Sequence, residues 1–560
     1  MTTHEIVIRG GTVADGTGAP LRRADVAIDH GRITEVGEHV APGREELDAQ
    51  GLLVAPGWVD IHTHYDGQAT WDPLITPSSW QGVTTVVMGN CGVGFAPVKP
   101  EKREWLIALM EGVEDIPGTA LHEGIQWQWE TFPEYLDALE ATPHAIDVAA
   151  QVPHAALRGY VMGDRGADHE ARPTAEEIAE MGRLAAEGVE AGAFGFSTSR
   201  TVAHRSADGR PTPSLTATAD ELVGIASAVG ATGRGVLQVV ADFVDLQSEF
   251  ALLRAMAEVS GRPLSITTLQ RPEFDEDEYR RILELIEAAG RDGLEVRGQV
   301  AARPVGLILT LDGRVHPLLP SATYQRLAHL PLSERAAELG RPEVRTAVLD
   351  EIAQAAAGGS DILSRFPVAF ALGDPPRYDQ DPAEAVDAAG AYDALLRDGG
   401  RGALYVPVMN YVGRSMQATR EMLVHPRTVP GLGDAGAHCT MICDGSFPTY
   451  LLQYWGRDAP EADRLGVEWI VQRQCADTAA AVGLRDRGVL EPGRRADVNL
   501  IDLGELAVRP PEMLYDLPAG GKRLVQHADG YRATLVAGEV VMRDGEPTGA
   551  LPGRLVRGSR

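Results

Sequence analysis

This chain of 560 residues contains few cysteines. Thiols this few and this scattered exclude a disulfide framework in so large a protein, and they favour a reducing compartment. The first residues also lack the basic-then-apolar pattern of a signal peptide, so we expect a cytoplasmic protein. The four cysteines are Cys91, Cys439, Cys443 and Cys475.

Long apolar runs and basic charge are scarce as well. No segment approaches the roughly 18 consecutive apolar residues that a membrane helix requires. The chain has 51 lysines and arginines against 80 acidic residues, which gives a formal net charge of −29. Such a field repels phosphate backbones and anionic membrane surfaces. We therefore expect neither a nucleic-acid partner nor a membrane partner, while a homo-oligomer is compatible with the sequence.

Both ends of the chain have the pattern of β structure. Alternating apolar and polar residues with glycine-rich turns predict short strands in residues 5–54 and again in residues 496–541. Neither end is long enough for a sandwich alone. We therefore expect one small β-sandwich domain that is assembled from residues 1–55 and 481–560.

The middle of the chain, residues 56–480, alternates strand-like runs with helical stretches such as 175–191 and 276–290. Eight such units favour an α/β fold of the (β/α)8 barrel type, in which catalytic groups lie at the C-terminal ends of the strands. The gap at about 301–428 is too long for one crossover, and we expect a mainly helical insertion that could cap the mouth. The predicted strands are 58–63, 83–89, 145–152, 192–197, 235–241, 264–269, 294–300 and 429–434.

Candidate metal ligands follow three of these strands. Side chains of a strand alternate faces, so His62 and His64 project to the same side and can hold one metal ion. Cys91 lies in a glycine-rich turn after the second strand, where a thiolate can ligate Zn²⁺; a buried apolar cysteine is the alternative. Asp434, after the eighth strand, can ligate the metal, take a proton from its bound water, or do both.

Further polar residues near strand ends are candidates for substrate contact. His154 follows the third strand and can polarise a carbonyl or serve a structural role. Arg158 and Arg200 are candidate anchors for an anionic group of the substrate, with a solvated loop charge as the alternative. His438 either faces the substrate or braces its loop.

Several segments resemble the amidohydrolase superfamily, and within it the D-aminoacylase (N-acyl-D-amino-acid deacylase) branch. The likeness covers nearly the full length of the chain. It implies a metal-dependent hydrolase with a bound Zn²⁺, in which a metal-bound water attacks an amide carbonyl of a small molecule. By this resemblance the metal ligands are His62, His64 and Cys91, and Asp434 is the proton shuttle. The segments are Ile8–Val13, Ala55–Gly57, Gly89–Gly92, Gly192–Thr198, Gly433–Asp434, Arg494–Val498 and Ala533–Gly538.

The fifth and sixth strands depart from the pattern of that branch. Members carry a metal-binding histidine at the end of each, and a lysine that holds the substrate carboxylate follows the second of these histidines. In our register Val240 and Thr268 take the histidine positions here, and Gln270 takes the lysine position as a candidate substrate contact. No lysine lies near the fourth strand, which argues against a carbamylated-lysine bridge. We therefore expect one metal ion per chain.

Two arrangements of that ion are open. In the first, His62, His64 and Cys91 hold the metal and Asp434 is free as the base. In the second, Asp434 is a ligand and Cys91 is held back, because a filled site of four ligands leaves no position for water. Different chemistry on the same scaffold is also open, namely a deaminase, a decarboxylase or a cyclic-amide hydrolase, and so is a non-catalytic ligand-binding protein. Arg303 is one more candidate partner for a substrate carboxylate.

Overall fold

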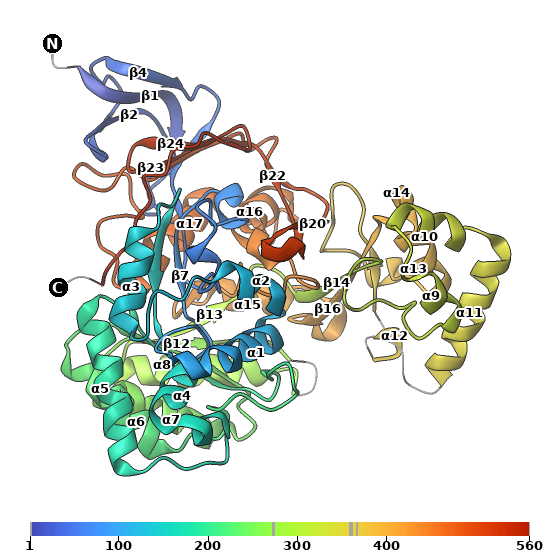
Figure 1. Cartoon of the computed structure of the whole chain (residues 1–560). Coiled ribbons are helices and arrows are strands. Elements are labelled where there is room, and N and C mark those ends of the chain that lie inside the picture. The colour runs from blue at the N-terminus through green and yellow to red at the C-terminus, as the bar shows by residue number, and fades with distance from the viewer. Residues whose placement is uncertain (1–2, 272–274, 358–361, 366–367, 559–560) are drawn as a thin grey trace.

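The computed structural model describes residues 3–271, 275–357, 362–365 and 368–558. Short parallel strands near its centre alternate with helices along the chain (Figure 1). The strands are β6 (Trp58–Asp60), β7 (Val83–Met88), β8 (Asp147–Ala150), β9 (Val152–Pro153), β10 (Gly195–Arg200), β11 (Val236–Ala241), β12 (Leu264–Thr267), β13 (Val296–Val300) and β17 (Thr428–Pro430). Every predicted strand overlaps one of them, the third as the pair β8 and β9.

These strands form two parallel sheets that are joined to each other. One sheet has the order β17-β13-β12-β11-β10-β9, and the other has the order β6-β7-β8. Just after β6 and β17, Thr63 and Ala435 form a parallel bridge. At the other junction, Phe194 N, just before β10, donates to Ala150 O of β8 at 2.8 Å. The ends of the first and last strands therefore lie side by side.

Helices connect these strands, and their ends follow from the sequence. In α5, Thr174 and Glu177 form a capping box, and the helix ends at Gly192, whose φ of 123° is costly for other residues. Predicted helices 175–191 and 276–290 agree with α5 and α8. No helix of the described ranges is both long and apolar enough to cross a membrane. The helices are α1 (Arg103–Glu114), α2 (Gly118–Gly124), α3 (Phe132–Ala141), α4 (His154–Met162), α5 (Ala175–Ala191), α6 (Ala219–Ala231), α7 (Leu246–Ser260), α8 (Glu278–Arg291), α15 (Gln417–Val424), α16 (Phe447–Tyr450), α17 (Val467–Gln472) and α18 (Thr478–Ala481).

The segment between β13 and β17 contains a lobe of its own. Three antiparallel strands in the order β14-β16-β15 carry several helices and enclose a separate apolar core. In Figure 1 this lobe extends to one side of the parallel sheets. The insertion is thus helical for the most part, and it is built on a small sheet. Its elements are β14 (Val305–Thr310), α9 (Ala322–Leu327), α10 (Leu332–Leu339), α11 (Pro342–Ala357), α12 (Ile362–Arg365), β15 (Phe370–Ala371), α13 (Ala388–Leu395), α14 (Arg397–Gly400) and β16 (Ala403–Met409).

Strands from both ends of the chain pair in one nine-stranded sheet. The N-terminal β5 lies between β1 and the C-terminal β18, so neither end completes the sheet alone. Its buried apolar side chains form a core of their own. The strands are β1 (His4–Val13), β2 (Arg22–Asp29), β3 (Arg32–Gly37), β4 (Gly43–Asp48), β5 (Leu53–Pro56), β18 (Val498–Ile501), β23 (Tyr531–Val536), β24 (Glu539–Arg543) and β25 (Glu546–Pro547); β19 (Ala507–Val508) pairs with β22 (Ala528–Asp529), and β20 (Glu512–Leu517) pairs with β21 (Gly521–Val525).

Asp147, the first residue of β8, binds the C-terminal part of the chain. Its carboxylate accepts hydrogen bonds from Arg487 Nη1 at 2.6 Å and from Arg495 Nη2 at 2.9 Å. A third bond comes from Arg554 N at 3.0 Å. The side chain of Asp147 is fully buried, and that of Arg487 is 1% exposed. This ion-pair network lies at the ends of the strands opposite to those where catalytic groups are expected.

We expect Asp147→Ala to lower the free energy of unfolding by about 3–5 kcal/mol, because two buried guanidinium groups lose their shared acceptor. Urea unfolding monitored by circular dichroism measures the loss. Asp137→Ala is the control, since Asp137 is exposed where it pairs with Arg557, and it should cost less than about 1 kcal/mol. Equal losses in the two variants would contradict a structural role for the buried network.

Candidate active site

The candidate site lies beyond the C-terminal ends of β6, β7 and β17. His62 and His64 follow β6, and Cys91 follows β7. Asp434 follows β17, and the chain next to it is bonded to the end of the first strand, where His64 N donates to Ala435 O at 2.8 Å. Residues that are distant in the sequence therefore meet at one edge of the parallel strands.

Two of these residues have unusual backbone conformations. Cys91 has a φ of 55° and Asp434 a φ of 44°, in the left-handed region. This region costs a non-glycine residue about 1–2 kcal/mol, so neighbouring contacts must hold it. At Cys91 one such contact is the bond from its backbone N to Gln238 Oε1 at 2.8 Å. The turns are thus fixed in forms that bring the thiol and the carboxylate to the histidines.

The side chains converge on a small buried volume. Asp434 Oδ1 lies 3.1 Å from His62 Nε2 and 3.5 Å from His64 Nε2. Cys91 Sγ lies 3.3 Å from His62 Nε2. Both histidines are 1% exposed, and Cys91 is 6% exposed. One ligand atom from each of His62, His64 and Cys91 can be chosen so that all three lie within 4.8 Å of one another.

This set of donors fits a metal ion. Imidazole nitrogen, thiolate sulfur and carboxylate oxygen are the ligands that Zn²⁺ takes in proteins. Asp434 Oδ1 is buried and has no hydrogen-bond donor, although buried polar atoms ordinarily have a partner. Within the described residues, the three ligands form the one cluster of this kind. Val240 and Thr268 at the ends of the fifth and sixth strands contribute no ligand atom to it.

Burial and charge shift the pKa values of the cluster in opposite directions. Burial lowers the pKa of His64 to about 4. Burial also disfavours the charged form of His62, but the neighbouring Asp434 carboxylate outweighs it and raises the pKa of His62. Burial opposes ionisation of Asp434 as well, yet His62 and His64 hold its pKa well below the usual value. Asp434 is therefore ionised at neutral pH, as a ligand or a proton acceptor must be.

Two polar residues that the sequence analysis did not select stand behind the histidines. Gln299 Oε1 lies 2.5 Å from His62 Nδ1, and Glu114 Oε1 lies 3.4 Å from His64 Nδ1. Gln299 had a signal in the sequence, because it is a polar residue near the end of the predicted strand 294–300. Glu114 had none, since it is the last residue of an ordinary amphipathic helix, α1.

His438 and His204 also belong to the surroundings of the site. His438 Nε2 lies 3.8 Å from Glu114 Oε2 and 4.0 Å from Asp434 Oδ2. His204, from the loop after β10, bonds through Nδ1 to Ser199 Oγ at 2.9 Å. Burial, followed by the charges of His438 and His64, lowers the pKa of His204 to about 3. His204 is therefore a neutral imidazole at the edge of the cluster.

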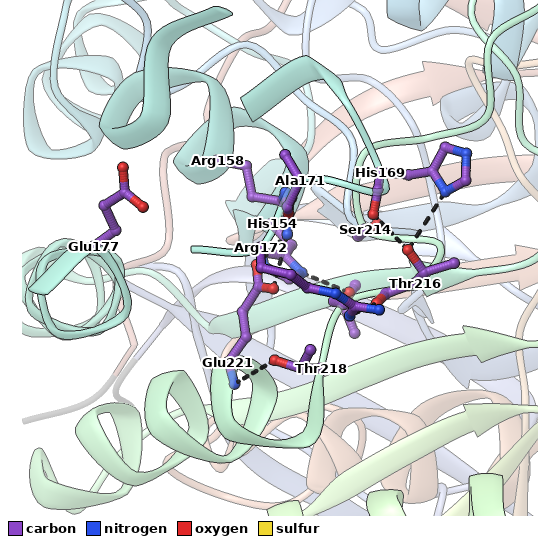
Figure 2. Close-up of polar contacts among 12 residues, drawn as sticks. His154, Arg158, His169, Ala171, Arg172, Glu177, Ser214, Thr216, Thr218 and Glu221 are labelled. Atoms are coloured by element: carbon purple, nitrogen blue, oxygen red, sulfur yellow. Dashed lines mark hydrogen bonds and ion pairs between the residues drawn. The ribbon is translucent and has the colours of Figure 1, made fainter. Parts of the chain in front are cut away.

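His154 and Arg158 have partners inside the protein (Figure 2). Arg158 Nη1 donates to both carboxylate oxygens of Glu221, at 2.6 and 2.8 Å, and His154 Nε2 lies 3.0 Å from Glu221 Oε1. All three side chains are fully buried. Figure 2 shows Glu221 reaching from its helix towards both basic side chains. The expectation that His154 and Arg158 bind substrate is not supported, because their polar groups hold α4 to α6 instead.

The other candidate anchors are engaged as well. Arg200 makes a bidentate pair with Glu249 at 2.8 and 2.7 Å. The side-chain amide of Gln270 bonds to the backbone: Nε2 donates to Glu276 O, and Oε1 accepts from Val412 N. These bonds argue against the expected substrate contacts, since Arg200 is paired with α7 and Gln270 with the backbone of Glu276 and Val412.

Arg303 is likewise occupied. It is 1% exposed, its Nη2 lies 3.0 Å from Asp444 Oδ1, and its guanidinium group stacks 3.9 Å from the ring centroid of Tyr378. The three arginines that the sequence suggested as carboxylate partners are thus all paired with internal acids.

Comparisons with known proteins agree with this geometry. The amidohydrolase family model matches residues 45–542. An N-acyl-D-aspartate deacylase of Alcaligenes xylosoxydans xylosoxydans is 30% identical over 560 residues, which cover 99% of this chain and 95% of that relative. A D-aminoacylase of the same organism is 40% identical over 195 residues, or 35% of this chain and 37% of that relative.

Solved structures extend the likeness over the whole molecule. An N-acyl-D-glutamate deacylase from Bordetella bronchiseptica, complexed with zinc and a phosphonate that mimics the tetrahedral intermediate, has a TM-score of 0.66 at 26% identity. The match covers 99% of this chain and 100% of that one. The fold and the cluster define a metal-dependent hydrolase. The chain belongs to the amidohydrolase family, and it cleaves a carbon–nitrogen bond other than a peptide bond in a small molecule.

The internal role of Glu221 can be tested directly. We expect Glu221→Gln to lower the free energy of unfolding by about 3–5 kcal/mol, because it leaves the buried Arg158 guanidinium without a counter-charge. The KM of the folded enzyme should not change. Glu177→Gln is a control, since Glu177 forms a more exposed pair with Arg165. Unchanged stability together with a raised KM would instead assign this cluster to the substrate.

Proposed function

We propose that this enzyme hydrolyses a small-molecule amide with one Zn²⁺ ion held by His62, His64 and Cys91, beside Asp434. The observation that carries the proposal is the convergence of these four side chains, with Asp434 Oδ1 3.1 Å from His62 Nε2 and the other donors close by. A single cluster of donors in the described ranges supports one ion per chain.

We further propose that the parallel strands close into a (β/α)8 barrel. The Thr63–Ala435 bridge and the bond from Phe194 N to Ala150 O join the two sheets at both junctions, which supports closure. The barrel would occupy residues 56–480 with the insertion at about 301–428. The nine-stranded sheet and its own apolar core support a small β-sandwich domain built from both ends of the chain.

The residues around the ion each have a task in this proposal. Gln299 Oε1 accepts a hydrogen bond from His62 Nδ1, which leaves Nε2 of that ring free to face Asp434 and Cys91. Asp434 provides the proton acceptor, since it is ionised and lies beside both histidines. When bound, the metal would polarise the amide carbonyl and lower the pKa of water.

Asp434 then moves one proton during hydrolysis. Its carboxylate takes the proton from the attacking water and delivers it to the leaving nitrogen as the carbon–nitrogen bond breaks. His438, whose Nε2 lies 4.0 Å from Asp434 Oδ2, lies where it can hydrogen-bond the substrate or the protonated carboxyl group. The neutral His204 imidazole borders the same space.

The substrate class we propose is an amide of the N-acyl type. Relatives named as N-acyl-D-aspartate deacylase and N-acyl-D-glutamate deacylase support it. A carboxylate on the substrate would not be held by Arg158, Arg200 or Arg303, because each is paired with an internal acid. We therefore propose that groups other than these three arginines recognise the rest of the substrate.

Protein purified without added metal should contain about one equivalent of zinc by elemental analysis, because one cluster of ligands is present. His62→Ala should lose most of that metal and retain its circular dichroism spectrum, since the large buried apolar core carries the stability of the fold. His39→Ala, at an exposed residue of the N-terminal part, is the control. Two tightly held equivalents, or full zinc content in His62→Ala, would contradict the proposed site.

Asp434→Asn keeps the shape and one ligating oxygen of the side chain but removes the proton acceptor. Turnover should therefore fall by the ~10²–10⁴-fold that is typical of a lost general acid–base group, with the zinc content preserved. Steady-state kinetics and elemental analysis of the same sample measure both quantities. Loss of zinc together with turnover would make Asp434 chiefly a ligand, and near-normal turnover would assign proton transfer to another residue.

A further inference from the structure

Glu114 is a buried acid at the site, and it has no part in the proton transfer proposed for Asp434. It is the last residue of α1, and its side chain is 2% exposed. Among the described residues, neither Glu114 Oε1 nor His64 Nδ1 has a hydrogen-bond partner. These two unpartnered atoms face each other at 3.4 Å. A donor and an acceptor that are both buried and so close to each other are complementary.

The position of Glu114 relative to the ring of His64 decides its role. Asp434 Oδ1 approaches the Nε2 side of His64, at 3.5 Å, and it also contacts His62. Glu114 approaches the opposite nitrogen, Nδ1. The carboxyl group of Glu114 thus lies behind the imidazole, on the side away from the convergent donor atoms.

Glu114 is also held firmly in this place. Its backbone O accepts a hydrogen bond from His438 N, and its neighbour Asp115 accepts bonds from Thr440 N at 3.0 Å and Thr440 Oγ1 at 2.6 Å. Asp115 has a φ of 51°, so the helix ends abruptly at this point. The end of α1 is therefore clamped to the loop that follows Asp434.

From this arrangement we propose that Glu114 is the positioning residue of His64. It accepts the Nδ1–H of His64, which fixes the tautomer with a free Nε2 and orients the ring towards the ion. Gln299 does the same for His62, so each metal-binding histidine has its own acceptor oxygen, one from an amide and the other from a carboxyl group. Such outer partners typically change metal affinity by about 10–100-fold when they are removed. This inference rests on the proposed function of the site.

The experiment compares zinc affinity among folded variants, measured by competition with a chromophoric chelator. Glu114→Leu removes the acceptor and should weaken zinc binding by about 10–100-fold. Glu114→Gln is isosteric and keeps an acceptor oxygen, so its affinity should lie between those of Glu114→Leu and the wild type. Glu111→Leu, one turn earlier on α1, is the matched control and should bind zinc as the wild type does.

A spectroscopic readout separates positioning from a general structural effect. In the Co²⁺-substituted protein, the visible absorption bands should change in Glu114→Leu and stay unchanged in Glu111→Leu, because the bands report ligand geometry. Wild-type affinity and spectrum in both Glu114 variants would overturn this inference while the metal site stands. A wild-type protein without zinc affinity would overturn the proposed function as well.

Discussion

The junction between the first and last parallel strands is the constraint on which the site depends. His64 N donates to Ala435 O, and Thr63 pairs with Ala435, so the turn that carries Asp434 lies against the two histidines. Without this contact the carboxylate would not reach His62 Nε2, 3.1 Å away. The convergence of His62, His64 and Asp434 is thus a direct product of how the strands meet.

Around that junction, several polar side chains are buried and held in fixed positions. Cys91 and Asp434 are held in left-handed conformations, and Gln299 and Glu114 stand behind the imidazole rings. Polar groups buried in this way are costly unless they have partners, and Asp434 Oδ1 and Glu114 Oε1 lack one among the residues that the structure describes. An ion at the centre would bind the convergent donors, and Gln299 and Glu114 would hold the two imidazole rings in the orientation that faces it.

Much of the fold and the centre of the site could be predicted from the sequence, and the surroundings could not. Strand-like runs that alternate with helical stretches predicted the parallel strands, and the HxH spacing at a strand end drew attention to His62 and His64. Arg158 was misread because its partner, Glu221, lies on a helix of the next unit, and no local pattern links the two residues. Glu114 could not be predicted for the same reason. It is a single acid at the end of a helix, and only the packing of the folded chain brings it next to His64.

Zinc K-edge X-ray absorption of the zinc-loaded protein counts the ligands by element and therefore tests whether Cys91 and the two histidines hold the ion. We expect a single zinc environment with one sulfur at about 2.3 Å and nitrogen or oxygen ligands at about 2.0–2.2 Å. The sulfur shell should disappear in Cys91→Ser. A spectrum of the wild type with nitrogen and oxygen alone, or with a second metal close by, would contradict a single ion held by His62, His64 and Cys91.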